Sequence, residues 1–192
     1  MARHRRHKGR SKFRIARNKK GIMNSSDDSL IGFATANILG SKYHVWDRVR
    51  KEIVATKHSK LLAAVKFIPT VSTWTGNCRC INAWISKHQS VQFKKRPMSS
   101  SNGLPTEWEK KKDKVHQLFS RVPQYSKILK QYKFDFRDRG RAGLKIKSSV
   151  KNFQLTLERN GRLRILQLGR VGKSKYVMDY RYPLTGYQAY CI

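Results

Sequence analysis

The stretch Phe153-Gln-Leu-Thr-Leu-Glu-Arg-Asn-Gly-Arg-Leu-Arg-Ile165 decides the fold class of this chain. Apolar and polar residues alternate up to Leu157, and the alternation resumes at Leu163. Between the two halves lies Asn160-Gly161, the strongest short-range signal for a two-residue turn that joins antiparallel strands. The pattern therefore predicts a β-hairpin and an antiparallel sheet.

The residues after this hairpin predict one more strand and a final helix. The segment from Gly169 to Lys175 interrupts the alternation with two glycines, and Tyr176 to Tyr180 then reads as a short strand. Pro183 suits the first turn of a helix, and apolar residues recur at helical spacing from there to Ile192. Such a helix, apolar nearly all round, must be buried. Periodicity alone favours an ordinary C-terminal helix that docks on a sheet.

Four segments of this region resemble the C-terminal signature of the tubby-like proteins: Ser149 to Leu155, Leu166 to Lys173, Met178 to Leu184, and Gln188-Ala189. The resemblance implies a mainly β fold in which an antiparallel barrel, closed or nearly closed, surrounds a central apolar C-terminal helix. It also implies that the outer surface of the barrel binds phosphoinositide headgroups at the cytoplasmic face of the plasma membrane.

Further patches extend the resemblance toward the N-terminus in a consistent order: Phe13 to Lys20, Leu30 to Gly32, Ala36 to Asp47, Ala63 to Ile81, and Pro123 to Phe136. Thr35 occupies the position at which the family has an Arg that contacts the headgroup. Members usually have additional strands before the basic turn and a tail after the Gln-Ala of the helix. The chain shows neither, so it resembles a divergent and incomplete member.

The charge balance indicates an anionic partner. The chain has 192 residues, with 43 Lys and Arg against 11 Asp and Glu and a formal net charge of +32. Anionic membranes and nucleic acids both attract such a surface, at about 1 kcal/mol per cation near a charged leaflet. No apolar run is long enough for a spanning helix, and no apolar stretch follows the basic N-terminus as in a secretory signal. Three cysteines favour a reducing, intracellular location, in cytosol or nucleus.

The length suits a single domain. Residues 1–26 contain ten Lys and Arg and no acid, and blocks of like charge without apolar periodicity are typical of disordered arms. We therefore expect a disordered arm at residues 1–11 and a tubby-like barrel domain at residues 12–192. The Ser, Gly and Lys-rich stretch near residues 86–115 predicts a variable polar loop within that domain.

Neither catalysis nor a metal site is expected from the motifs. The sequence has no Gly-rich phosphate loop after a strand and no nucleophile elbow, and its acids form no recognisable pair. Cys78 and Cys80 are closely spaced, but zinc sites need four ligands in recognisable pairs, so free thiols are the favoured interpretation. We expect a non-enzymatic protein without a cofactor.

Five cations are the candidate headgroup ligands that the resemblance and the charge pattern suggest: Arg17, Lys19, Lys20, Lys42 and Arg79. Arg and Lys both suit phosphate, and clustering raises selectivity above bulk attraction. The alternative for each is an ordinary solvated cation. A second hypothesis is a basic protein bound to DNA or RNA, chromatin- or ribosome-associated, with Tyr and Trp available for stacking, although these aromatics suit a core equally well. We expect a monomer in either case.

Overall fold

The computed structural model describes residues 1–7, 9–24, 28–47, 60–68, 80–87, 104, 108–110, 112–136, 145–159 and 161–192. The chain divides into two compact units. Unit 1 comprises Met1–Lys66, Ala83–His116 and Thr185–Ile192, and unit 2 comprises Phe67–Asn82 and Gln117–Leu184. Neither of the α-helices that the structure describes has the length or the apolar run needed to cross a membrane.

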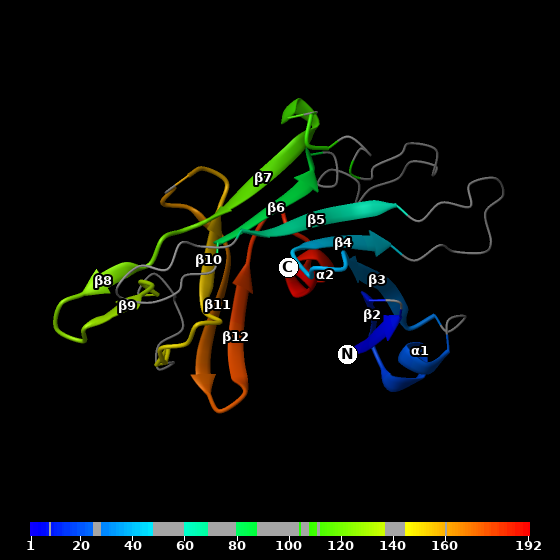
Figure 1. The fold of residues 1–192 in the computed structure, drawn as a ribbon, viewed down its shortest axis with the longest axis horizontal. Helices are drawn as coiled ribbons and strands as arrows, with labels where there is room; N and C mark the ends of the chain where they lie inside the picture. The colour runs from blue at the N-terminus through cyan, green and yellow to red at the C-terminus, as the bar shows by residue number, and fades with distance from the viewer. Residues whose placement is uncertain are drawn as a thin grey trace. The chain divides into compact units, whose positions relative to one another are not determined.

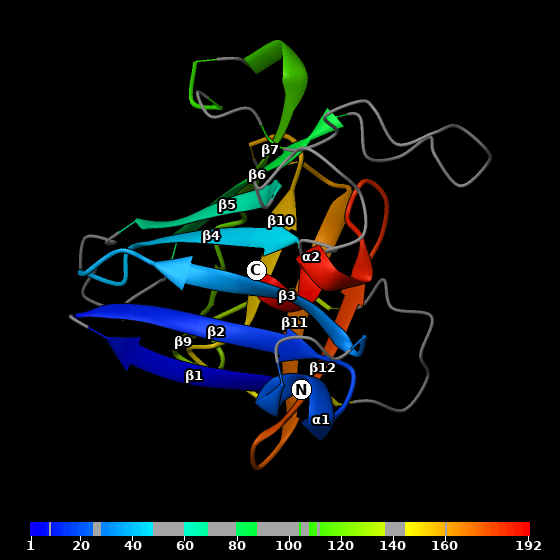
Figure 2. The ribbon, with the colours of Figure 1, turned by 90° about the vertical axis from the view of Figure 1, so that its right-hand side faces the viewer.

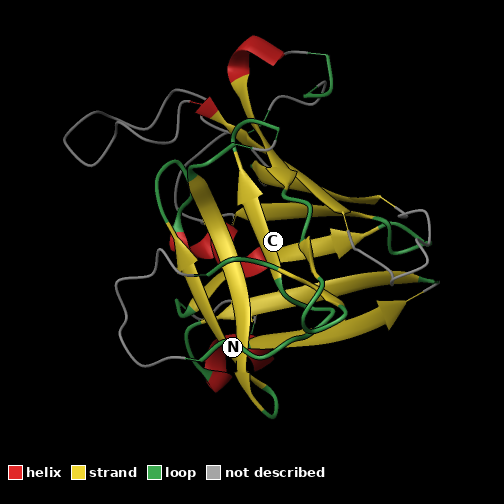
Figure 3. Cartoon of the chain, turned by 90° about the vertical axis from the view of Figure 1, so that its left-hand side faces the viewer, coloured by secondary structure: helices red, strands yellow, loops and turns green. Residues whose placement is uncertain are grey.

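The main feature is a ten-stranded antiparallel sheet with the order β1-β2-β3-β4-β5-β6-β7-β10-β11-β12, which confirms a mainly β fold. Among the described strands β1 and β12 are the two ends, so hydrogen bonds do not close the sheet. Strands β8 and β9 form a separate pair, and strands dominate the described residues in Figure 3. The bounds are β1 Ala2–His7, β2 Arg10–Ala16, β3 Leu30–Ala36, β4 Lys42–Asp47, β5 Leu61–Ile68, β6 Cys80–Ser86, β7 Val115–Ser120, β8 Gln124–Ser126, β9 Gln131–Lys133, β10 Phe153–Thr156, β11 Arg164–Gly172 and β12 Lys175–Tyr180.

Strands β1 to β4 lie side by side in unit 1, with a short helix α1 (Lys19–Met23) after β2 (Figure 2). Alternate residues on β2 to β5 point to opposite faces. One face carries the buried side chains, with exposed fractions of 5% or less: Ile15, Ala34, Val45, Ala63 and Val65. The opposite face, here called the outer face, carries the cations.

The predicted disordered arm is wrong for most of its length. Residues Ala2–His7 form β1, and their six pairs with β2 run from Ala2 opposite Ile15 to His7 opposite Arg10. The ring of His4 stacks on Phe13 with a centroid distance of 4.5 Å, and the amino group of Met1 donates to the carbonyl of Ala16 at 2.7 Å. Backbone pairing and this stacking outweigh the repulsion that the charge pattern indicated.

The C-terminal helix α2 (Gly186–Cys191) is shorter than predicted, and Pro183 lies outside it. Thr185 is the N-cap: its hydroxyl accepts from the backbone N–H of Gln188 at 3.2 Å, and the Gln188 side chain accepts from the backbone N–H of Thr185 at 3.0 Å. This capping box sets the start of the helix. Gln188 and Ala189 are buried, whereas Tyr190 is 52% exposed, so the prediction of burial on all sides is wrong. Figure 1 shows α2 beside β3 and β4.

The predicted hairpin is confirmed in unit 2, although its turn differs. Strands β10 and β11 pair antiparallel, with Leu155 opposite Leu166. Strand β10 ends at Thr156 and β11 begins at Arg164, so the connection is longer than two residues, and Asn160 lies outside the described residues. The carbonyl of Glu158 accepts from the Thr156 hydroxyl at 2.6 Å and from the Gly161 N–H at 3.0 Å. Strand β11 also runs through Gly169 to Gly172, where an interruption was predicted. The predicted strand at 176–180 is confirmed as β12.

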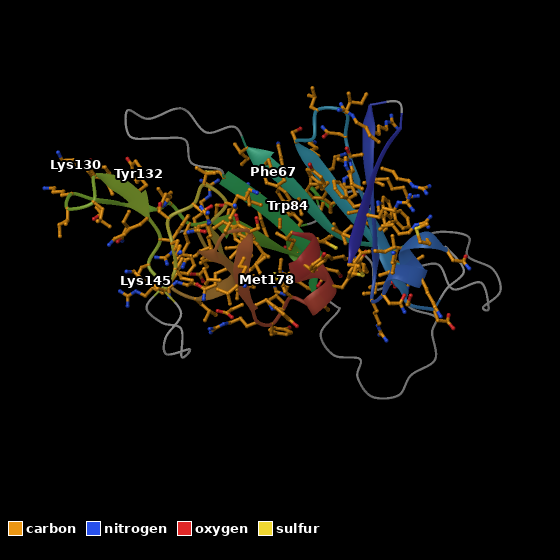
Figure 4. The ribbon with its side chains drawn as sticks, turned by 90° about the horizontal axis from the view of Figure 1, so that it is seen from below. Phe67, Trp84, Lys130, Tyr132, Lys145 and Met178 are labelled. Atoms are coloured by element: carbon orange, nitrogen blue, oxygen red, sulfur yellow. The ribbon has the colours of Figure 1, made fainter. Side chains whose placement is uncertain are left out.

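Gln154 anchors a buried polar network beneath this hairpin. Its side chain is fully buried, donates to the Asp135 carbonyl at 2.7 Å and to Gln167 at 3.1 Å, and accepts from Arg121 at 3.1 Å. Because Gln154 is buried, β10 does not show a simple alternation of buried apolar and exposed polar residues. The β8–β9 pair extends away from these strands within unit 2, with Lys130 at its turn (Figure 4).

Much of the predicted polar loop near residues 86–115 lies outside the described residues. Its described part is not wholly polar, because Leu104 and Trp108 are only 5% and 7% exposed. They form a small cluster with Ala64 and Val115, against which Leu61 and Trp84 pack. The Trp84 and Trp108 rings lie 4.5 Å apart.

Candidate anion-binding surface

Two rows of directly opposed residues cross the outer face of unit 1. The strand registers define the first row as Arg5, Lys12, Thr35 and His44, on β1 to β4 in that order. They define the second row as Arg3, Arg14, Phe33 and Trp46. Each row begins with two cations from the first hairpin and ends with an aromatic ring from β4.

The four cations of these rows line one cavity of about 160 Å³: Arg3, Arg5, Lys12 and Arg14. We call it the basic groove. Among the described residues, no acidic side chain lines it. Like charges that are directly opposite on neighbouring strands repel, and an anion placed between them would offset that repulsion. Guanidinium and ammonium groups both bind phosphate oxygens.

Neighbouring groups hold three of the four cations in place. Arg14 donates through Nη1 to the carbonyl of Ile22 at 3.0 Å, near the C-terminal end of α1. Arg3 Nη1 lies 2.9 Å from the sulfur of Met23. The Nζ of Lys12 lies 4.5 Å from the centroid of the Phe33 ring, which is a cation–π contact. The groove is thus organised by α1 on one side and by β3 on the other.

His44 adds little positive charge to the outer face near neutral pH. Burial lowers the pKa of His44, and the nearby Lys42 lowers it further, while Glu109 opposes the shift. The imidazole is therefore neutral at pH 7. In the neighbouring row, the Trp46 indole N–H donates to the Thr35 hydroxyl at 3.0 Å, so Thr35 serves as an acceptor here. The charge of this face comes from its Arg and Lys residues.

The structure brings together only part of the predicted site. Arg17, Lys19 and Lys20 are exposed where β2 leads into α1. Lys42 begins β4 at the far end of β3. The length of β3, at about 3.3 Å per residue, puts it about 20 Å from Arg17, Lys19 and Lys20. Its Nζ lies 3.7 Å from Glu109, in an exposed pair. Arg79 lies outside the described residues.

Sequence reasoning missed the basic groove itself. The alternation of Arg3 with Arg5, and of Lys12 with Arg14, is the period of a strand with one charged face. Intervening His4 and Phe13 stack on the opposite face. The spacing of every second residue was therefore visible in the N-terminal sequence. Counting the charges without their spacing led instead to the prediction of a disordered arm.

Comparisons with known proteins agree along the whole chain. A family model described as Tub family matches residues 1–192. Tubby-like protein 8 of Arabidopsis thaliana is 50% identical over 194 residues, which cover 100% of this chain and 49% of the relative. Tubby-like protein 4 of Oryza sativa subsp. japonica is 50% identical over 197 residues, 100% of this chain and 47% of that protein. Tubby-related protein 3 of Homo sapiens is 25% identical over 175 residues, 86% of this chain and 38% of that protein. The chain thus spans about half the length of the two plant relatives.

Proposed function

Because this chain belongs to the Tub family, we propose that it is a non-enzymatic protein that binds phosphoinositide headgroups in the basic groove. The observation that carries the proposal is that four cations from β1 and β2 line one small cavity. Among the described residues, no acidic side chain lines it. A bisphosphate headgroup presents several phosphate oxygens at fixed spacing, and a preorganised set of Arg and Lys side chains distinguishes it from a single diffuse charge.

The cations predicted from the sequence have a secondary place in this proposal. Arg17, Lys19 and Lys20 lie in the segment that leads into α1, and α1 in turn holds Arg14 through the Ile22 carbonyl. They would contact neighbouring lipid headgroups, while the basic groove holds the phosphoinositide. Lys42 would contribute from the other end of β3, and Arg79 stays in the proposed set as the sequence placed it.

We also propose the central position of α2 within a nearly closed barrel. Two hydrogen bonds within unit 1 support it: Tyr187 Oη donates to the Trp46 carbonyl at 2.8 Å, and Gln188 Nε2 donates to the Leu62 carbonyl at 3.0 Å. Both acceptors belong to strands of the sheet, so the helix is tied to β4 and β5. As a cellular setting we propose the cytoplasmic face of the plasma membrane, for a monomer that is also present in cytosol and nucleus.

One observation favours a second candidate, a nucleic acid. The Phe33 and Trp46 rings are 6.2 Å apart and nearly parallel, at 19°, on the same face as the basic groove. Aromatic rings beside cations form a stacking platform for unpaired bases. Both rings are only half-buried, but Lys12 already lies over Phe33, and for this reason the lipid headgroup is our first choice.

A sedimentation experiment separates the two ligands. The protein is spun with neutral vesicles, with phosphatidylserine vesicles, and with phosphatidylinositol bisphosphate vesicles of matched total charge. DNA and RNA are titrated in parallel across a salt series. Preference for the bisphosphate at equal charge supports the proposal. Equal binding to both anionic vesicles, together with a steep salt dependence on nucleic acid, contradicts it and supports the second candidate.

Neutralising two groove cations is expected to weaken binding to the bisphosphate vesicles about thirtyfold, since each cation contributes about 1 kcal/mol and 1.4 kcal/mol is a factor of ten. The variant is Arg5→Gln with Lys12→Gln. Its matched control is Lys173→Gln with Lys175→Gln, two exposed lysines at the β11–β12 turn, which removes the same net charge. We expect the control to lose roughly threefold or less because isolated surface charges are screened. Equal losses in both variants would show that only overall charge matters.

A further inference from the structure

The turn between β3 and β4 carries two of the more exposed large apolar side chains of unit 1. Ile38 is 62% exposed and Leu39 is 86% exposed. We call these two residues the apolar tip. Single exposed apolar residues are common on protein surfaces, so the question is whether the surroundings of this pair indicate a partner.

Hydrogen bonds fix the shape of the turn. The side-chain oxygen of Asn37 accepts from the backbone N–H of Ser41 at 2.8 Å and from that of Lys42 at 3.0 Å. The backbone N–H of Asn37 donates to the Lys42 carbonyl at 3.0 Å. Gly40 takes a positive φ of 64°, a conformation that glycine adopts readily. The apolar tip is therefore presented by a preorganised loop, and burying it requires little further ordering.

Three cations lie at the same end of the sheet as the apolar tip. The β1–β2 turn lies beside it, because a Cβ on Gly9 would be 3.6 Å from Ile38. Arg10 begins β2 next to that turn, and Lys42 and Lys66 are paired on β4 and β5 at the same end of the sheet. Figure 2 shows the two turns together at one end of the β1–β4 strands. Within the described part of the chain, the tip thus has Arg10, Lys42 and Lys66 at its end of the sheet, with Glu109 paired to Lys42, and stays open to solvent.

We infer that the apolar tip inserts into the outer part of an anionic lipid bilayer while the basic groove holds the headgroup. Apolar side chains with Lys and Arg nearby suit the membrane interface, where they enter about 5–10 Å while the cations meet lipid phosphates. Ile38 is three residues beyond Thr35, which shares a row with Lys12, so the groove is about 10 Å behind the tip. With the tip at the acyl boundary, the groove reaches the headgroup layer. The inference rests on the proposed function and adds the mode of membrane contact.

The test replaces Ile38 and Leu39 together by serine in the full chain. We expect binding to phosphatidylinositol bisphosphate vesicles to fall about tenfold, since part of two large apolar side chains leaves the lipid. Binding of soluble inositol trisphosphate, measured by calorimetry, should stay unchanged because the groove is intact. The control, Ile128→Ser with Leu129→Ser, removes a similarly exposed pair at the β8–β9 turn. A tenfold loss in this control as well would overturn the inference.

A second measurement separates failure of the inference from failure of the proposed function. The Leu39→Trp variant is compared with the unmodified protein on phosphatidylserine vesicles that carry brominated acyl chains. Extra quenching of the introduced indole is the expected result, and it requires only an anionic bilayer. Absence of extra quenching on vesicles that bind the protein overturns insertion. Quenching without any preference for the bisphosphate leaves insertion standing and contradicts the proposed headgroup specificity.

Discussion

Replacing Gly32 by alanine is expected to lower the free energy of unfolding by about 3 kcal/mol, the upper part of the range for overpacked core sites. Gly32 is on the core face of β3, opposite Asp47. A Cβ there would collide with the carbonyl oxygen of Trp46 and with the hydroxyl of Tyr187. The same two groups form the 2.8 Å hydrogen bond that ties α2 to β4. The added methyl group would therefore push β4 and α2 apart and break the hydrogen bond between them.

Urea unfolding followed by tryptophan fluorescence measures this effect. The described tryptophans Trp46, Trp84 and Trp108 all belong to unit 1, the unit that the substitution perturbs. Gly172→Ala is the matched control, because a Cβ at Gly172 would make only ordinary contacts of 3.6 Å or more with Lys175. We expect the control to change stability by about 0.5 kcal/mol or less. Equal midpoints for Gly32→Ala and the parent would contradict the close approach of α2 to β3.

The second large effect is expected for Gln188→Leu, a loss of about 3 kcal/mol from the two polar groups that it leaves unpaired. Strand β5 has an irregularity in its pairing with β4: Val45 is opposite Ala63 and Trp46 is opposite Leu61, so Leu62 is the extra residue. The fully buried side chain of Gln188 donates to the Leu62 carbonyl at 3.0 Å and also accepts from the backbone N–H of Thr185. Leucine leaves the partly buried Leu62 carbonyl and Thr185 N–H without this partner, at about 1–3 kcal/mol each.

The same substitution at an exposed glutamine is the control. Gln124 on β8 is exposed, so Gln124→Leu should leave the free energy of unfolding within about 0.5 kcal/mol of the parent. Amide hydrogen exchange adds a local readout, because loss of the Gln188 bond should raise exchange in α2 and around Leu62 first. A stable Gln188→Leu variant with unchanged exchange would show that α2 does not depend on this bond.

The sequence predicts β10, β11 and β12 because their pattern is local. Residues 153–168 contain both partners of one hairpin, with the fully buried Leu155 opposite the fully buried Leu166. The length of the turn was misjudged: β10 ends at Thr156, whose hydroxyl donates to the Glu158 carbonyl, and β11 begins only at Arg164, while Asn160 lies outside the described residues. The helix start was misjudged in a similar way, because the Thr185 cap outweighs the preference of proline for a first turn.

The site was harder to predict because it depends on pairing. Arg3 and Arg14 are far apart in the sequence and directly opposite in the sheet. A charge run and a charged strand have the same composition, and only the hydrogen-bonded partner decides between them. Lys42 shows the converse: it resembles Lys19 and Lys20 in chemistry, but the length of β3 lies between them. Proximity in a sheet follows register, which the sequence specifies only weakly where neighbouring residues are alike.

Unit 1 is assembled from segments that are far apart in the sequence, and this affects how it folds during synthesis. Strands β4 and β5 are translated well before α2, since the bonds that Tyr187 and Gln188 make to them span 141 and 126 residues of sequence. A nascent chain emerging from the ribosome can pair β1 to β5 early, but the Leu62 carbonyl on β5 lacks the Gln188 side chain until α2 leaves the exit tunnel. Closure of such long loops is entropically unfavourable. We therefore expect chaperones to bind the exposed apolar face of the sheet in the interval before α2 docks.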